Sequence, residues 1–214
     1  MELNTLAMVH EFLRQHVRPG AFCIDATAGR GRDTALLCRL AGASGRVLAF
    51  DIQQCALDAT AALLASEGLQ AELHLDSHAH MGAYAAAGSV DCIVFNFGRL
   101  PGGDPQIMTR ADSSVAAVKT ALELLKPGGV MALAIYYGGA NGYDERDALL
   151  EALRGADARR YSVLCCDWRN RGGDPPIAVF VWRERSCADS EGGETPAMRK
   201  LQFGRSRRMN DHDS

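Results

Sequence analysis

Near the start of the chain, two acidic residues and two glycines have the types and spacing of a nucleotide site. Asp25 follows a short apolar segment, and Gly29 and Gly31 come soon after it in the run Asp25-Ala-Thr-Ala-Gly-Arg-Gly-Arg-Asp-Thr34. Glycines at such a turn let the backbone approach a ligand and adopt positive φ. A helix that starts there offers free N–H groups to a carboxylate or another anion. Asp51, about twenty residues further on, can accept hydrogen bonds from a ribose diol.

Polar side chains also stand at the ends of two later apolar segments. Ser77 and His78 follow the third predicted strand, and Asn96 ends the fourth. Each of them alone is typical of a helix cap or a turn. Because the carboxyl ends of parallel strands meet at one edge of a sheet, their joint placement instead predicts one site for a nucleotide-like ligand. The residues assigned to this cofactor site are Asp25, Thr27, Gly29, Arg30, Gly31, Asp33, Thr34, Asp51, Gln53, Ser77, His78 and Asn96.

The glycine run discriminates among nucleotide ligands. A dehydrogenase motif would have a third glycine at the position that Thr34 occupies. The chain also lacks the Gly-x-x-x-x-Gly-Lys-Ser/Thr run of a phosphate-binding loop. An acidic residue at the end of the first strand suits the cationic methionine portion of S-adenosylmethionine. We therefore expect S-adenosylmethionine as the cofactor, with NAD-dependent oxidation as a more distant alternative.

Predicted strands and helices alternate around these residues. Through residue 137 the alternation predicts a parallel sheet with helices on both faces, and two final strands joined only by a loop predict an antiparallel end. This α/β arrangement is that of class I methyltransferases, a Rossmann-like doubly wound sheet. The predicted strands cover residues 21–25, 46–51, 71–76, 90–96, 130–137, 161–168 and 177–182. The predicted helices cover residues 3–16, 31–41, 54–66, 78–87, 144–154 and a segment that Ser113 or Ser114 caps and that runs to about Leu125.

The composition fits a single domain of an intracellular protein. The chain has 214 residues and a net charge of −3, so it lacks the strong basic excess of a general nucleic-acid binder. No apolar run approaches the roughly 20 residues that span a bilayer, and no signal peptide is evident, so we expect a cytoplasmic protein without membrane contact. Seven cysteines without a CxxC pair predict reduced, buried thiols and no metal site. We assign residues 1–185 to the methyltransferase domain and 186–214 to a polar, disordered tail.

Five motifs carry a resemblance to a known family. They are Asp25-Ala-Thr-x-Gly-x-Gly-x-Asp-Thr34, Phe50-Asp-Ile-Gln53, Ser77-His78, Asn96-x-Gly-x-Leu-Pro-Gly-Gly-Asp104 and Asn170-x-x-x-Asp-Pro-Pro176. Over residues 3–184 the chain resembles the family named "Putative rRNA methylase", whose characterised members methylate 5-(aminomethyl)-2-thiouridine in tRNA. The resemblance implies a class I methyltransferase fold, S-adenosylmethionine as methyl donor, and the wobble uridine of a tRNA anticodon loop as substrate. The side-chain amine of that uridine would receive the methyl group.

Two polar residues are candidates for catalysis. An alkylamine must lose a proton before it attacks, and Asn96 can accept an N–H through its amide oxygen. Asp104 is interpreted as a proton acceptor or as a residue that stabilises a turn, and the same two roles are open for Asp174. Tyr136 and Tyr137 can stack on an unpaired base, although we expect one of them to pack within its strand. The residues assigned to the substrate site are Gly98, Arg99, Pro101, Gly102, Gly103, Tyr136, Tyr137, Asp174 and Pro175.

The chain departs from the usual family pattern at four positions. Arg30 and Arg32 stand where Asn and His are frequent, Arg99 stands where Tyr is frequent, and Tyr137 stands where His is frequent. The first pair leaves cofactor binding through backbone groups intact, whereas the other two lie near the expected substrate. The alternatives are therefore an rRNA or small-molecule methyltransferase on the same fold, or a non-catalytic nucleotide- or RNA-binding module. A homodimer is compatible with the sequence, and His10 is interpreted as structural.

Overall fold

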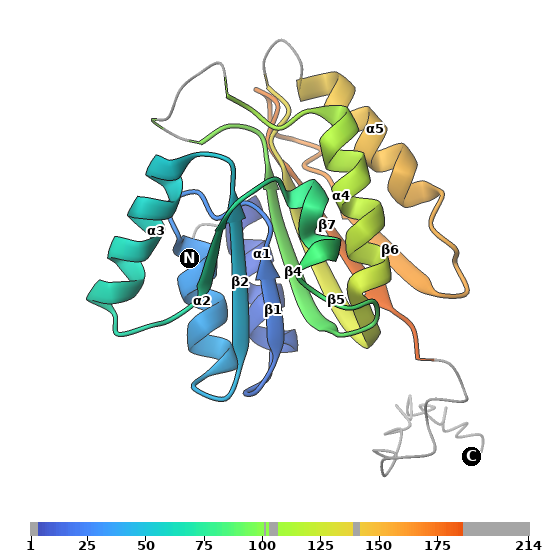
Figure 1. Ribbon diagram of the computed structural model, residues 1–214. Coiled ribbons are helices and arrows are strands. Elements are labelled where there is room, and N and C mark those ends of the chain that lie inside the picture. The colour runs from blue at the N-terminus through green and yellow to red at the C-terminus, as the bar shows by residue number, and fades with distance from the viewer. Residues whose placement is uncertain (1–3, 101, 103–106, 139–141, 186–214) are drawn as a thin grey trace, which may run out of the picture.

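The computed structural model describes most of the expected domain (Figure 1). The described residues are 4–100, 102, 107–138 and 142–185. The predictions for Pro101, Gly103, Asp104 and the tail at 186–214 lie outside them. Among the helices in this part of the chain, none has the length and apolar character needed to cross a membrane.

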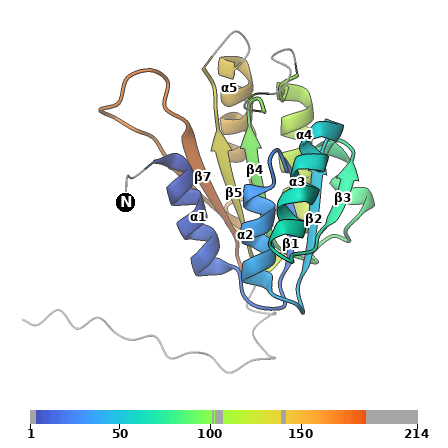
Figure 2. The same ribbon diagram turned by 90° about the vertical axis from the view of Figure 1, so that its left-hand side faces the viewer.

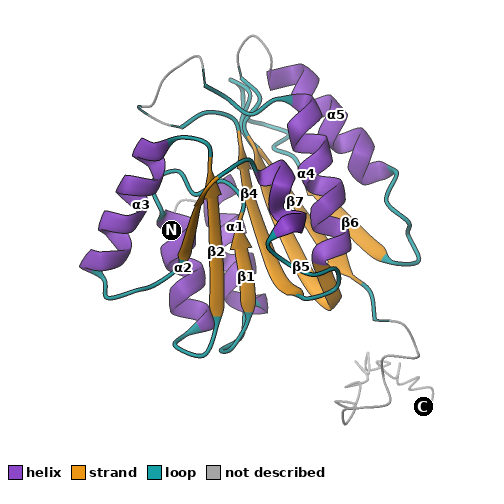
Figure 3. Cartoon of the chain, viewed as in Figure 1, coloured by secondary structure: helices purple, strands orange, loops and turns teal. Residues whose placement is uncertain are grey.

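In the described part of the chain, a seven-stranded sheet forms the centre of the molecule (Figure 3). The strands are β1 (Phe22–Asp25), β2 (Arg46–Asp51), β3 (Glu72–Leu75), β4 (Val90–Phe97), β5 (Leu125–Ile135), β6 (Tyr161–Cys166) and β7 (Ile177–Arg183). Their order is β3-β2-β1-β4-β5-β7-β6, with β1 to β5 parallel to one another and β7 antiparallel to both of its neighbours. The predicted doubly wound α/β sheet with an antiparallel C-terminal strand is confirmed.

Helices cover both faces of this sheet (Figure 2). They are α1 (Thr5–His16), α2 (Arg32–Ala41), α3 (Gln54–Ser66), the 3₁₀ helix η1 (His78–Ala83), α4 (Ala111–Leu124) and α5 (Gly142–Arg154). The first three lie on one face, and the other three lie on the opposite face. Because side chains alternate along a strand, Ile93 and Phe95 of β4 pack beneath α4 while Val94 packs toward α2. A sheet buried on both faces explains the nearly continuous apolar runs in its strands.

The strand order changes direction between β1 and β4. From β1 the chain runs outward through β2 and β3, and then it returns to place β4 on the other flank of β1. A crevice forms outside the carboxyl ends of the strands at such a point. Asp25, Asp51 and Asn96 lie at the ends of β1, β2 and β4, so they share this edge of the sheet. The topology therefore brings together the polar residues that the sequence places far apart.

The predicted start of helix α4 is wrong. Helix α4 begins at Ala111 with Arg110 in the N-cap position, so neither Ser113 nor Ser114 caps it. The hydroxyl of Ser114 instead donates a 2.5 Å hydrogen bond to Glu145 of α5 inside the protein. A serine turned inward by a buried partner cannot be distinguished from a capping serine by its local sequence.

The predicted bounds of the fifth strand are also wrong. Strand β5 starts at Leu125, because Val90 pairs with Leu125 before the bulge at residues 126–129 and pairing with β4 resumes after it. The Pro and Gly residues of that segment look like a turn, yet the sheet continues on both sides of them. The strand ends just before Tyr136, so Tyr136 and Tyr137 lie in the loop that follows.

The sheet core predicts a large contrast between two leucine substitutions. Leu133 of β5 is completely buried, whereas the side chain of Leu164 on the outer strand β6 is 50% exposed. Leu133→Ala should lower the free energy of unfolding by about 2–5 kcal/mol, because it leaves a cavity in the central core. Leu164→Ala should change it by about 0.5 kcal/mol or less. Urea denaturation measures both values, and equal losses would contradict this packing.

Candidate functional site

Asp25 is a buried support of the glycine turn. Its carboxylate accepts hydrogen bonds of 2.6 Å from the hydroxyl of Thr34 and 3.1 Å from the backbone N–H of Thr27. Burial raises the pKa of Asp25 to about 7, and the negative charge of nearby Asp33 adds to this effect. The structure thus joins three residues of the predicted cofactor set, with Asp25 beneath the turn. The charge of Asp33, which adds to the effect of burial, favours a cationic ligand portion nearby.

The glycine turn itself is held by Asp51. Gly29 and Gly31 have φ of 55° and 78°, a region that side chains disfavour. The backbone N–H groups of Gly29 and Gln53 each donate a 2.9 Å hydrogen bond to the Asp51 carboxylate. A Cβ on Gly31 would lie 2.8 Å from the Cα of Thr60, so α3 also requires glycine there. Each carboxylate oxygen keeps a further lone pair, which suits a ribose diol.

Asn96 is linked through Asp33 to the N-terminal helix. Nδ2 of Asn96 donates a 2.6 Å hydrogen bond to one carboxylate oxygen of Asp33, and Nε2 of His10 lies 2.6 Å from the other oxygen. The backbone N–H of Asn96 donates to the hydroxyl of Thr27, so β4 and the glycine turn are tied together. Sequence reasoning missed the role of His10, because a histidine in an amphipathic helix shows no local sign of a partner in another helix.

His78 supplies a buried hydrogen-bond acceptor. Burial lowers the pKa of His78 to about 4, and a hydrogen bond with the backbone of Ala26 opposes this effect only in part. Its Nε2 atom is buried and has no hydrogen-bond partner within the described residues. A neutral imidazole that donates through its other nitrogen offers Nε2 as an acceptor. This atom fits an amino group such as that of adenine, whereas Ser77 serves as the N-cap of η1.

The expected substrate loop lies against the glycine turn. Thr109 joins the two ends of this loop by two hydrogen bonds to Gly98. Its hydroxyl accepts one of 2.7 Å from the backbone N–H of Gly98, and its own backbone N–H donates one of 2.8 Å to the carbonyl of Gly98. A Cβ added to Gly29 would lie 3.4 Å from the Leu100 side chain, and one on Gly102 would lie 2.7 Å from the Arg30 guanidinium. The predicted cofactor and substrate segments are therefore in direct contact.

A buried glutamate that the sequence did not reveal anchors this loop base. Glu145 accepts hydrogen bonds from the hydroxyls of Thr109 and Ser114 at 2.9 and 2.5 Å. Its position in the first turn of α5 suggests an exposed helix-end charge, yet its side chain is buried. The network joins α4 and α5 to the backbone of Gly98 at the end of β4.

The two tyrosines after β5 have different environments. Tyr136 is 41% exposed, and its backbone N–H donates to the carbonyl of Phe97. Tyr137 is buried, with the Arg146 guanidinium 4.7 Å from its ring centroid. One of the pair is buried, although both tyrosines lie beyond the strand in which one was expected to pack. Tyr136 is the tyrosine that keeps a partly exposed side chain.

The Asp174 loop docks onto α5 beside these tyrosines. The Asp174 carboxylate accepts a 2.6 Å hydrogen bond from the hydroxyl of Tyr143. The backbone of Asp174 has a φ of 53°, which adapts it to a tight turn before the half-buried Pro175. This contact supports the turn-stabilising interpretation of Asp174.

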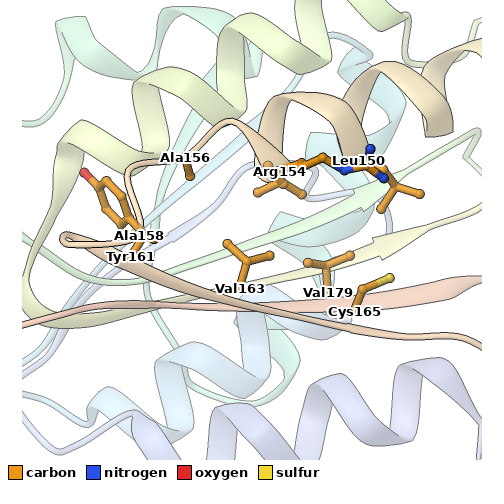
Figure 4. A pocket seen from close by; sticks show the side chains of 9 residues that line it. Leu150, Arg154, Ala156, Ala158, Tyr161, Val163, Cys165 and Val179 are labelled. Atoms are coloured by element: carbon orange, nitrogen blue, oxygen red, sulfur yellow. The ribbon is translucent and has the colours of Figure 1, made fainter.

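The described residues also line two grooves. One, of about 420 Å³, runs between α5 and β6 and is lined mainly by apolar side chains such as Leu150 and Val163 (Figure 4). Cys165 also lines it and is exposed, so the expectation that this thiol is buried is wrong. A smaller groove of about 270 Å³ between α1, α2 and α3 is lined by His10 and Arg32.

Comparison with known proteins identifies the family. The family model described as "Putative rRNA methylase" matches residues 47–182. The chain belongs to this family. A curated relative from Arabidopsis thaliana, named "tRNA (mnm(5)s(2)U34)-methyltransferase, chloroplastic", is 31% identical over 191 residues, which cover 84% of this chain and 69% of that protein.

Solved structures of similar proteins share the architecture of this rRNA methylase family member. A "putative rRNA-methylase" from Clostridium thermocellum has a TM-score of 0.83 at 37% identity and covers 86% of this chain and 99% of its own. A "putative methyltransferase" from Streptococcus mutans, in complex with SAH (S-adenosylhomocysteine), has a TM-score of 0.78 at 32% identity with the same coverage. An S-adenosylmethionine-dependent O-methyltransferase from Thermotoga maritima, 16% identical, has a TM-score of 0.59 and shows the shared fold alone. The fold is that of class I methyltransferases.

The buried histidine makes the stability of this methylase depend on pH. The pKa of His78 is about 4 in the folded protein, against an ordinary value of 6.5 for a histidine. As the pH falls from 6.5 to 4, the unfolded chain takes up the proton first, so folding free energy is lost. His78→Gln removes this titration. Between pH 7 and pH 4.5 the free energy of unfolding, measured by urea denaturation, should fall by on the order of 2 kcal/mol more in the wild type than in the variant. Parallel losses in the two proteins would show that His78 is not held neutral.

Proposed function

We propose that this protein transfers a methyl group from S-adenosylmethionine to the side-chain amine of 5-aminomethyluridine, with or without the 2-thio group, at the wobble position of tRNA. The observation that carries the proposal is the 2.6 Å hydrogen bond from Nδ2 of Asn96, at the end of β4, to Asp33. It occurs in a chain that is 31% identical to the Arabidopsis tRNA methyltransferase. We assign the activity to a domain of residues 1–185.

The methyl donor is S-adenosylmethionine, because the chain belongs to a methylase family and the Streptococcus mutans relative is in complex with SAH. When bound, the donor supplies a methyl group on a positively charged sulfur. The N–H groups at the start of α2 suit its carboxylate. Asp51 suits its ribose diol, and the unpaired Nε2 of His78 suits the amino group of its adenine. The positive φ of Gly29 and Gly31 gives the turn the conformation in which backbone can approach a ligand closely.

Asn96 is the proposed catalytic residue. The acceptor amine must present a lone pair, so its N–H groups need acceptors that also favour loss of a proton. With Nδ2 committed to Asp33, the amide of Asn96 offers its oxygen to the amine. Asp104, outside the described residues, stays a prediction as a proton acceptor.

Substrate recognition falls to the loops around this amide. The exposed ring of Tyr136 supplies a face on which an unpaired anticodon base can stack. Arg99 is exposed on the loop after β4 and suits a phosphate of the RNA backbone. Gly98, Gly102, Asp174 and Pro175 shape the two loops that border the same space. A cytoplasmic location and a homodimer stay predictions.

An rRNA substrate is the second candidate, because the matching family is described as an rRNA methylase family. Mass spectrometry of nucleosides separates the two. Purified protein should add one methyl group to 5-aminomethyluridine in tRNA taken from cells that lack this modification, when labelled donor is supplied. Ribosomal RNA and free alkylamines should stay unlabelled under the same conditions. Methylated rRNA with unchanged tRNA would overturn the proposed substrate.

Asp51 provides a test of the donor site. Asp51→Ala should raise the Kd for S-adenosylhomocysteine at least about tenfold in calorimetry, because each hydrogen bond to a charged group contributes about 1.5–3 kcal/mol. The variant also loses the bond that holds Gly29. Asp58→Ala on the exposed side of α3 is the matched control and should bind as the wild type does. Equal affinities of all three proteins for S-adenosylhomocysteine would contradict the placement of the ribose at Asp51.

A further inference from the structure

We propose that His10 is a positioning residue for methyl transfer, which acts through Asp33 to fix the orientation of the Asn96 amide. The inference rests on the proposed function of Asn96. His10 belongs to α1, a helix that contributes no residue to the predicted cofactor or substrate sites. Its Nε2 atom lies 2.6 Å from Asp33, and its side chain keeps 21% of its surface exposed.

The chemistry of Asp33 makes the orientation of Asn96 unambiguous. An ionised carboxylate can only accept hydrogen bonds, so only the NH₂ end of the amide can face it. A flipped amide would place two oxygens against each other and would offer NH₂ to the acceptor amine. That arrangement would donate to the lone pair that must attack the methyl group. The 2.6 Å bond from Nδ2 to Asp33 therefore selects the useful orientation.

His10 in turn keeps the Asp33 carboxylate in place. Asp33 is 5% exposed, and its two oxygens are shared between Asn96 and His10. A buried carboxylate that loses one partner has an uncompensated lone pair and moves toward water or takes up a proton. Either change weakens its hold on the Asn96 amide. Asp33 also lies close enough to the buried Asp25 to raise its pKa, so a donor on Asp33 from His10 eases the burial of both carboxyl groups.

Helix α1 is fixed firmly enough to serve this purpose. The hydroxyl of Thr5 donates a 2.6 Å hydrogen bond to the carbonyl of Pro176, and the indole of Trp168 donates to Thr5 at 2.9 Å. At the other end of the helix, Phe12 stacks on Phe180 with ring centroids 4.5 Å apart. Pro176 and Phe180 lie next to and on β7, so these contacts fix α1 against the sheet. His10 on α1 is thereby held in place beside Asp33 of α2.

Four variants test the proposal on tRNA that carries 5-aminomethyluridine. His10→Ala should lower kcat about tenfold or more, with little change in KM for tRNA or in Kd for S-adenosylhomocysteine. His10→Gln keeps an N–H donor and should stay within about threefold of wild-type kcat. Gln15→Ala, on the exposed side of the same helix, is the matched control and should behave as the wild type does. Asn96→Ala should lower kcat at least about tenfold.

The decisive comparison is the double variant. If His10 acts through Asn96, His10→Ala in the Asn96→Ala background should cause no further loss of kcat. Losses that multiply would overturn the proposal, and so would a folded His10→Gln protein as slow as His10→Ala. If His10→Ala fails to fold, His10→Met fills the same space without a donor and replaces it in the cycle. An unaffected Asn96→Ala protein would refute the role proposed for Asn96, whereas a slow Asn96→Ala beside a normal His10→Ala would refute this inference alone.

Discussion

Two neighbouring buried carboxylates, Asp25 and Asp33, set the arrangement of this site. Burying carboxylates is unfavourable, and burial, followed by the nearby charge of Asp33, raises the pKa of Asp25. The protein offsets the cost of burial by surrounding both groups with donors: Thr27 and Thr34 on one, Asn96 and His10 on the other. Those donors come from different elements, so satisfying the two carboxylates fixes α1, the glycine turn and the end of β4 relative to one another. A binding site with this negative potential suits a donor that carries positive charge.

Direct contacts also join the predicted cofactor and substrate sites. Leu100 lies against Gly29, and Gly102 lies under the guanidinium of Arg30, so the loop after β4 rests on the glycine turn. Glu145 fixes the far end of that loop through the Thr109 hydroxyl. A ligand that orders the glycine turn therefore also borders the surface on which the acceptor must sit. Arg30, which departs from the usual family residue, is part of this contact rather than a neutral replacement.

The sheet and its polar strand ends were predictable because they follow local rules. Apolar runs followed by Asp25, Asp51 and Asn96 reveal both the strands and the edge at which ligands bind. The partners of those residues were not predictable, since they depend on contacts between distant segments. His10 meets Asp33 23 residues away, and Glu145 meets Thr109 36 residues away. The early start of β5 escaped prediction for a related reason, because only pairing with β4 shows that the strand continues across a Pro-Gly segment.

The amine acceptor that we propose is compatible with the chemistry of the residues near the end of β4. Methylation of a pyrimidine carbon commonly requires a thiolate nucleophile, and thiolates need a lowered pKa and access to the substrate. Here burial raises the pKa of Cys38 to about 11, and the pKa of Cys92 is well above its usual value because of a hydrogen bond with Cys23 and burial. A hydroxyl acceptor would need a strong base beside it, and Asn96 is not one. An amide oxygen is sufficient for an amine, which is nucleophilic once it is neutral. The site at the end of β4 thus suits the nitrogen methylation that we propose, with the loops around Tyr136 as the proposed contact for the RNA that carries the amine.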